Sequence, residues 1–109
     1  MENLIKEMTE AGVVPVVKID NADDAVSLAA ALRKGGINCA EITFRTDAAE
    51  ESIKRISTEF PDMLIIAGTV LTPKQADKAI AAGAKAIVSP GLNPIIVRHC
   101  IEKGYPVVP

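Results

Sequence analysis

Short runs of aliphatic and β-branched residues alternate with longer polar stretches along the whole chain. The apolar runs lie at residues 13–19, 38–44, 63–67, 86–89 and 105–108. Between them, apolar positions recur at helical spacing, in the sets Ala25/Leu28/Ala29/Leu32, Ala49/Ile53/Ile56, Ala76/Ala79/Ile80 and Ile96/Val97/Cys100/Ile101. This alternation predicts a repeat of βα units, in which each helix covers one face of a parallel sheet.

The expected helix boundaries carry capping signals. Thr72 and Asn93 each precede a proline, so both are expected to cap a helix whose first residue is that proline. Gln75 is placed to bond back to the Thr72 cap, and Asp47 begins a related arrangement. Glycines that can end a helix follow at Gly12, Gly35, Gly83 and Gly104. The boundaries therefore agree with the apolar periodicity.

A repeat of this kind fits two architectures, an open doubly wound sheet or the first part of an eight-stranded (β/α)8 barrel. The fifth predicted strand reaches Pro109 with no helix after it, which favours the barrel. The fold class is therefore predicted as α/β, a (β/α)8 TIM barrel of which residues 1–109 form the N-terminal half: a helix, four βα units and a fifth strand. Such a half would expose unpaired strand edges, which favour self-association.

Composition excludes several classes of function. The chain has 109 residues, a net charge of −2 and no run of Lys or Arg, so neither nucleic acid nor an anionic membrane surface is expected as a partner. No apolar run approaches the length of a membrane span, and the chain is expected in the cytoplasm. Cys39 and Cys100 lack metal-ligand spacing, so both are expected to be free buried thiols.

The second predicted strand carries three polar residues on alternate positions. Glu41, Thr43 and Arg45 are two residues apart, which places them on one face of the strand. Near the carboxyl end of a barrel strand, an inward carboxylate lies at the usual position of an active site. Arg45, or Lys18 at the end of the first strand, could partner Glu41. A structural ion pair at the rim is the alternative interpretation.

Several further positions have weaker chemical signals. Gly68 permits close approach of a ligand or backbone and Thr69 adds a hydroxyl, although a tight turn with Thr69 as a cap explains both. The turn at Ser89 is similarly ambiguous. His99 lacks a partner at catalytic spacing and is expected to be a solvated surface histidine. The acidic segment 20–24 is explained better by helix capping than by metal binding.

Several of these segments together resemble one enzyme family. The segments are AEITFRT at 40–46, IAGTVL at 66–71, VSPG at 88–91, VVPVV at 13–17 and YPVVP at 105–109. In this order they resemble the 2-keto-3-deoxy-6-phosphogluconate (KDPG) aldolase family, also called 4-hydroxy-2-oxoglutarate (KHG) aldolase. The resemblance extends over essentially the whole chain.

The resemblance implies a homotrimeric class I aldolase built on a (β/α)8 barrel. Such a lyase cleaves KDPG to pyruvate and glyceraldehyde 3-phosphate, or KHG to pyruvate and glyoxylate, through a lysine Schiff base and without metal or cofactor. It also implies that Glu41 is the general acid/base, that Arg45 binds the keto-acid carboxylate, and that Thr69 hydrogen-bonds the substrate. Thr43 and Lys18 are expected to complete the substrate-binding surface.

The resemblance also implies that residues 1–109 lack essential parts. In this family the Schiff-base lysine lies on the sixth strand and the phosphate site after the seventh and eighth, so this chain alone is expected to be inactive. Lys18 is then expected to bind anionic substrate rather than form the imine, and Ile66 departs from the family's usual glycine. Two alternatives remain open: a non-enzymatic half barrel that self-associates through its open sheet edges, and another barrel enzyme in which Glu41 is a base and no imine forms.

Overall fold

The computed structural model describes residues 2–109, and helices and strands alternate along them. The elements in chain order are α1 (Glu2–Ala11), β1 (Val16–Val17), the 3₁₀ turn η1 (Ala22–Asp24), α2 (Ala25–Lys34), β2 (Cys39–Thr43), α3 (Ala49–Glu59), β3 (Leu64–Gly68), α4 (Pro73–Ala82), β4 (Ala86–Val88), α5 (Pro94–Lys103) and β5 (Val107–Val108). The strands form one parallel sheet in the order β1-β2-β3-β4-β5. This α/β arrangement is that of the first half of a (β/α)8 barrel, as predicted.

The two edge strands are shorter than predicted. Their apolar runs begin at residues 13 and 105, but pairing starts only after Pro15 and Pro106. Each proline still accepts a hydrogen bond through its carbonyl, from Glu41 N at 2.8 Å and from Ile87 N at 2.9 Å. Because proline has no N–H to donate, the regular ladder cannot extend back through it.

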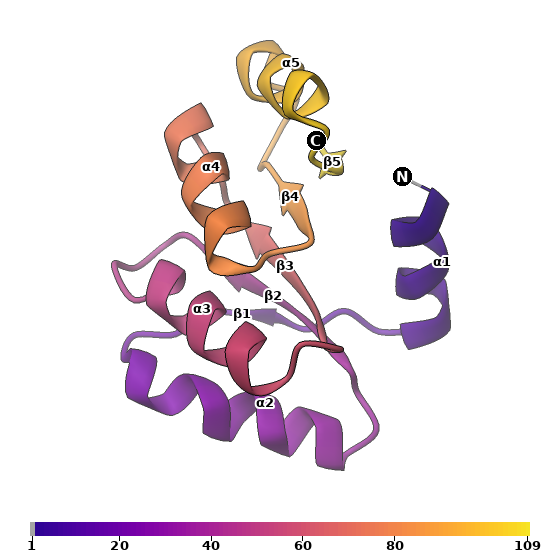
Figure 1. Cartoon of the computed structure of the whole chain (residues 1–109), viewed down its shortest axis with the longest axis vertical. Helices are drawn as coiled ribbons and strands as arrows, with labels where there is room; N and C mark the ends of the chain where they lie inside the picture. Colours follow the sequence, from indigo (N-terminus) through magenta and orange to yellow (C-terminus); the bar gives the residue numbers. More distant parts are fainter. Residues whose placement is uncertain (1) are drawn as a thin grey trace.

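Two apolar cores lie on opposite faces of the sheet. On the outer face, the helices that follow the strands pack against Ile42, Ile65 and Ile87, which are fully buried. On the inner face, Leu4 of α1 packs with Cys39, Leu64, Ile66 and Ala86. Figure 1 shows the strands lying between α1 on one side and α3 and α4 on the other. Both cysteines are free and buried, as predicted.

Most of the predicted caps are present. Thr72 Oγ1 accepts a hydrogen bond from Gln75 N at 3.1 Å, and Asn93 Oδ1 accepts one from Ile95 N at 3.0 Å. The Gln75 side chain bonds to Leu71 N at 2.8 Å, one residue before the position predicted.

No helix among residues 2–109 is both long and apolar enough to cross a bilayer.

The predicted cap at Asp47 is wrong. Ala48 occupies the cap position of α3, and it has no side chain that could accept a hydrogen bond. The hydroxyl of Thr46 accepts from Ala48 N at 3.3 Å and also donates to the Ile19 carbonyl. The loop between β2 and α3 is therefore held by Thr46, which leaves the side chain of Asp47 exposed.

Candidate active site at the carboxyl ends of the strands

The parallel register brings the polar residues of β2 and the end of β3 together. Glu41 lies opposite Ile66, and Thr43 lies opposite Gly68. Val16 of β1 is the partner of Glu41 on the other side. Because side chains alternate along a strand, Glu41 and Thr43 share the inner face with the residues that pack against α1. The carboxyl ends of the strands therefore form a rim with one carboxylate on its inner face, among the residues that the structure describes.

The carboxyl group of Glu41 lies directly over Gly68. A Cβ added to Gly68 would overlap Oε2 and Cδ of Glu41 and would come within 2.8 Å of its Cγ. Burial raises the pKa of the Glu41 carboxyl, and the positive charge of Arg45 partly opposes this effect. A carboxyl group with a raised pKa exchanges protons more readily near neutral pH, which suits a general acid/base.

Thr43 is almost completely buried, with 1% of its surface exposed. Its Oγ1 donates a hydrogen bond of 3.2 Å to the carbonyl oxygen of Val17 in β1. This bond crosses between two neighbouring strands where the β1–β2 pairing ends. The hydroxyl thus joins the edge strand to β2.

Arg45 lies beyond the end of strand β2. Strand β2 ends at Thr43, and Arg45 lies in the following turn with its side chain exposed. It lines a hollow of about 270 Å3 together with Gln75 and Lys78 of α4. The alternation that places Glu41 and Thr43 on one face therefore does not fix the direction of Arg45. Its charge still acts on Glu41 through space.

Lys18 does not partner Glu41 in this structure. Its Nζ lies 3.3 Å from Asp20 Oδ1, and both side chains are more than half exposed. An exposed pair of this kind contributes little to stability and leaves the ammonium accessible. Lys18 pairs with Asp20, so the interpretation of Lys18 as the ion-pair partner of Glu41 is wrong.

The backbone after Gly68 adopts an unusual conformation. Thr69 has a φ of 55°, and it is the only non-glycine residue with a positive φ in the part of the chain that the structure describes. A β-branched residue is strained in this left-handed region, and such strain is concentrated at functional sites. Thr69 does not cap α4, because Thr72 does so.

On the next strand, Ser89 Oγ donates to the Gly91 carbonyl at 2.6 Å, so this hydroxyl belongs to a tight turn.

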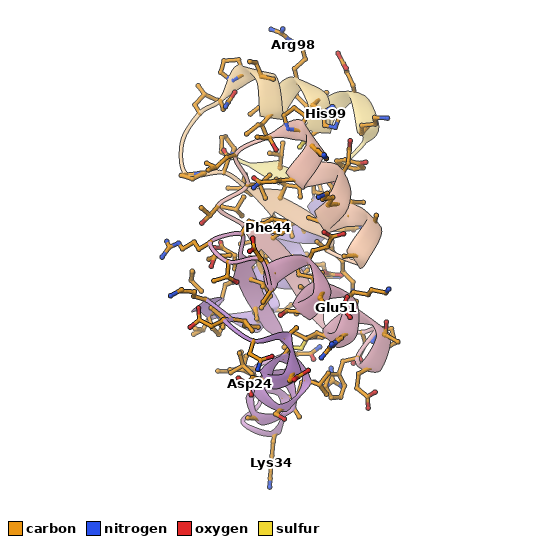
Figure 2. The ribbon with its side chains drawn as sticks, turned by 90° about the vertical axis from the view of Figure 1, so that its left-hand side faces the viewer. Asp24, Lys34, Phe44, Glu51, Arg98 and His99 are labelled. Atoms are coloured by element: carbon orange, nitrogen blue, oxygen red, sulfur yellow. The ribbon has the colours of Figure 1, made fainter. Side chains whose placement is uncertain are left out.

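The prediction that His99 is a solvated surface histidine is wrong. Its Nε2 lies 2.8 Å from Oδ1 of Asp77 in α4, and Tyr105 donates its hydroxyl to the same oxygen at 3.0 Å. In Figure 2 the side chain of Arg98 points outward, whereas His99 lies under α5 close to α4. Sequence spacing could not reveal this cluster because its members come from three separate segments. It lies outside the rim and fastens α5 to α4.

The structure thus defines an α/β protein of the half-barrel type, with a carboxylate and a strained turn at the end where barrel enzymes have their active sites. The family model for KDPG and KHG aldolase matches residues 4–109. The chain belongs to this aldolase family.

Individual relatives agree with the family model. The chain is 49% identical over 109 residues to 2-dehydro-3-deoxy-phosphogluconate aldolase of Treponema pallidum (strain Nichols), covering 100% of this chain and 52% of that protein. It is 37% identical over 102 residues to KHG/KDPG aldolase of Escherichia coli (strain K12), covering 94% and 48% of the two chains. The chain therefore spans about half the length of these curated relatives.

A solved structure gives the same picture. The KDPG aldolase from Legionella pneumophila, with pyruvate captured as a covalent carbinolamine intermediate, matches with a TM-score of 0.84 at 40% identity. The match covers 88% of this chain and 47% of that one. The half-barrel fold and the family are thus supported by both sequence and structure.

Proposed function

We propose that residues 1–109 are the N-terminal half of a single (β/α)8 barrel domain of a class I aldolase that acts on KDPG, KHG or both. The observation that carries this proposal is the carboxyl group of Glu41, held over Gly68 at the carboxyl ends of the strands with a raised pKa. Membership of the aldolase family supports the reaction type. The Schiff-base lysine is proposed to lie in the part of the barrel that follows residue 109.

Glu41 is proposed to transfer the protons of the reaction. Cleavage breaks the C3–C4 bond of the substrate, and the bonding electrons move into the iminium, which becomes an enamine. The proton of the C4 hydroxyl is lost to the Glu41 carboxylate, directly or through one water, as the aldehyde forms. Glu41 then returns a proton to C3 of the enamine, and hydrolysis releases pyruvate. The raised pKa of Glu41 favours proton transfer in both directions near neutral pH.

The remaining rim residues are proposed to bind the substrate. Arg45 has an exposed guanidinium that lacks a carboxylate partner within residues 2–109, and its planar shape suits bidentate binding of the keto-acid carboxylate. Thr69 offers a hydroxyl group on the same rim, and Lys18 offers an accessible ammonium. Thr43 is proposed to take part only as a hydrogen-bond acceptor, because it is buried and its hydroxyl proton is donated to Val17. By its family the complete protein is proposed to be a cytoplasmic homotrimer that needs no metal or cofactor.

The proposal is tested by measuring pyruvate release from KDPG and from KHG with a coupled dehydrogenase assay. The complete protein should release pyruvate from at least one of them, and the 109-residue chain from neither. In the complete protein, Glu41→Gln should lose activity and the exposed helix variant Glu51→Gln should retain it. Absence of pyruvate release with both substrates contradicts the proposal.

A second candidate function is that of a self-associating half barrel. Ile95 and Ile101 of α5 and Leu92, two residues before α5, are each more than 60% exposed. Strands β1 and β5 are each paired on one side only. Exposed apolar surface beside unpaired strands favours association. Sedimentation of the 109-residue chain distinguishes the candidates: a stable, concentration-independent dimer favours the second, and a monomer or a polydisperse mixture favours the first.

A further inference from the structure

Gly68 is a glycine whose backbone conformation does not require one. It closes strand β3, and its φ lies outside the left-handed region that favours glycine. In that conformation a β-branched residue would normally strengthen the strand, and glycine weakens it. Glycines 12, 36, 83 and 104 differ, because each has a positive φ that explains its identity. Gly68 therefore needs another explanation.

The space above the Cα of Gly68 explains why this residue is a glycine. A Cβ at Gly68 would meet three atoms of one side chain, Oε2, Cδ and Cγ of Glu41. A Cβ at Gly91, on the neighbouring rim loop, would meet no heavy atom within 4 Å. Thr43, the register partner of Gly68, is buried, and Glu41 is half-buried.

We infer that Gly68 is a positioning residue, whose missing side chain provides the space in which the carboxyl group of Glu41 is held at the rim. Gly68 contacts neither substrate nor reacting atoms in this account, since it acts through Glu41. Its importance for catalysis rests on the proposed function, but the positioning itself does not.

The position of the Glu41 carboxyl group over Gly68 affects its protonation. Over Gly68 the carboxyl group is partly removed from water, and this burial raises its pKa. Arg45 is the charged group that acts on it in the opposite direction. An alanine methyl in the same space would move the carboxyl group outward into water, where the desolvation is lost and the pKa falls toward its ordinary value.

The first test measures the Glu41 carboxyl pKa by 13C NMR titration of the 109-residue chain. Gly68→Ala should lower this pKa relative to the unsubstituted chain, and Gly91→Ala should leave it unchanged. The result that overturns the inference is an unchanged Glu41 pKa in a folded Gly68→Ala chain. This readout separates positioning from a general structural effect, because a merely weakened strand does not move one carboxyl pKa.

A second measurement covers the case in which Gly68→Ala does not fold. The double variant Gly68→Ala/Glu41→Ala removes the side chain that the new methyl would meet, so it should fold as well as Glu41→Ala alone. If the double variant also fails to fold, glycine serves the strand backbone and the inference is wrong.

Gly68→Ala also tests how the position of Glu41 affects catalysis, and the NMR test does not depend on the outcome of this measurement. In the complete protein, Gly68→Ala should lower kcat by about 10²-fold, since displacing a reacting group by about 1 Å has an effect of that size. It should also shift the pH profile of kcat in the direction of the Glu41 pKa change. If the NMR result holds and the complete protein lacks aldolase activity, the proposed function fails while the positioning of Glu41 by Gly68 stands.

Discussion

Replacing Thr69 with glycine should stabilise the protein while impairing the site. Thr69 has a φ of 55°, a conformation that disfavours an L-residue by about 1–2 kcal/mol. Glycine relieves this strain, but its greater freedom in the unfolded chain returns about 0.5–1 kcal/mol. The Thr69 side chain is only half-buried and makes no hydrogen bond among the described residues, so little packing is lost. The net expectation for Thr69→Gly is a gain of about 0.5–1 kcal/mol in the free energy of unfolding.

Urea denaturation of the 109-residue chain at neutral pH measures this gain. The matched control is Thr72→Gly, because Thr72 has a φ of −138° and its hydroxyl caps α4. The same substitution there should destabilise the chain by a few tenths of a kcal/mol, roughly the effect of losing a side-chain cap to glycine. In the complete protein Thr69→Gly should raise KM for the keto acid, because it removes the hydroxyl group that is proposed to bind the substrate. A chain destabilised by Thr69→Gly as much as by Thr72→Gly would refute the claim that residue 69 is strained.

Three further predictions address acid–base chemistry, packing and pH. Glu41→Gln in the complete protein should lower kcat by about 10²-fold or more, measured by pyruvate release, because the amide keeps the shape of the side chain but transfers no proton. Ser52→Ala should raise the free energy of unfolding by about 1 kcal/mol in urea denaturation, because the Ser52 hydroxyl is buried without a hydrogen-bond partner. The His99 side chain lowers the pKa of Asp77, so the contribution of Asp77 to stability is present above its unfolded pKa and is lost as pH falls through its folded pKa. Asp77→Asn should therefore lower stability at neutral pH and flatten its loss in acid, and unchanged melting curves between pH 2 and 7 would contradict this.

The sequence predicts the order and type of the elements because local signals agree with each other. The apolar run around Ile42 and the cap at Thr72 are both local features, and both are present in the structure. The ends of the edge strands are predicted less well. Pro15 and Pro106 limit pairing there. The length of an apolar run does not show at which residue the hydrogen bonds to the neighbouring strand begin.

The site is predicted where it depends on alternation along one strand, and less well where it depends on contacts across the fold. Glu41 and Thr43 share the inner face as predicted, whereas Arg45 lies past the end of the strand. The ion pair of Lys18 with Asp20 and the hydrogen bond of His99 to Asp77 both involve side chains whose separation depends on the path of a turn or on the packing of two helices. Residue types and spacing alone do not determine these distances.

In the proposed function, this chain supplies the acid–base half of a Schiff-base aldolase site, and the nucleophile lies elsewhere in the complete protein. The most direct test is intact-mass spectrometry, under denaturing conditions, after incubation with pyruvate and borohydride. We expect a reduced pyruvate adduct on the complete protein and an unmodified mass near 11.5 kDa for residues 1–109 alone. An adduct on the 109-residue chain would make one of its own lysines the nucleophile, and absence of an adduct on the complete protein would exclude imine chemistry. Either result would contradict the proposed division of the site between the two halves of the barrel.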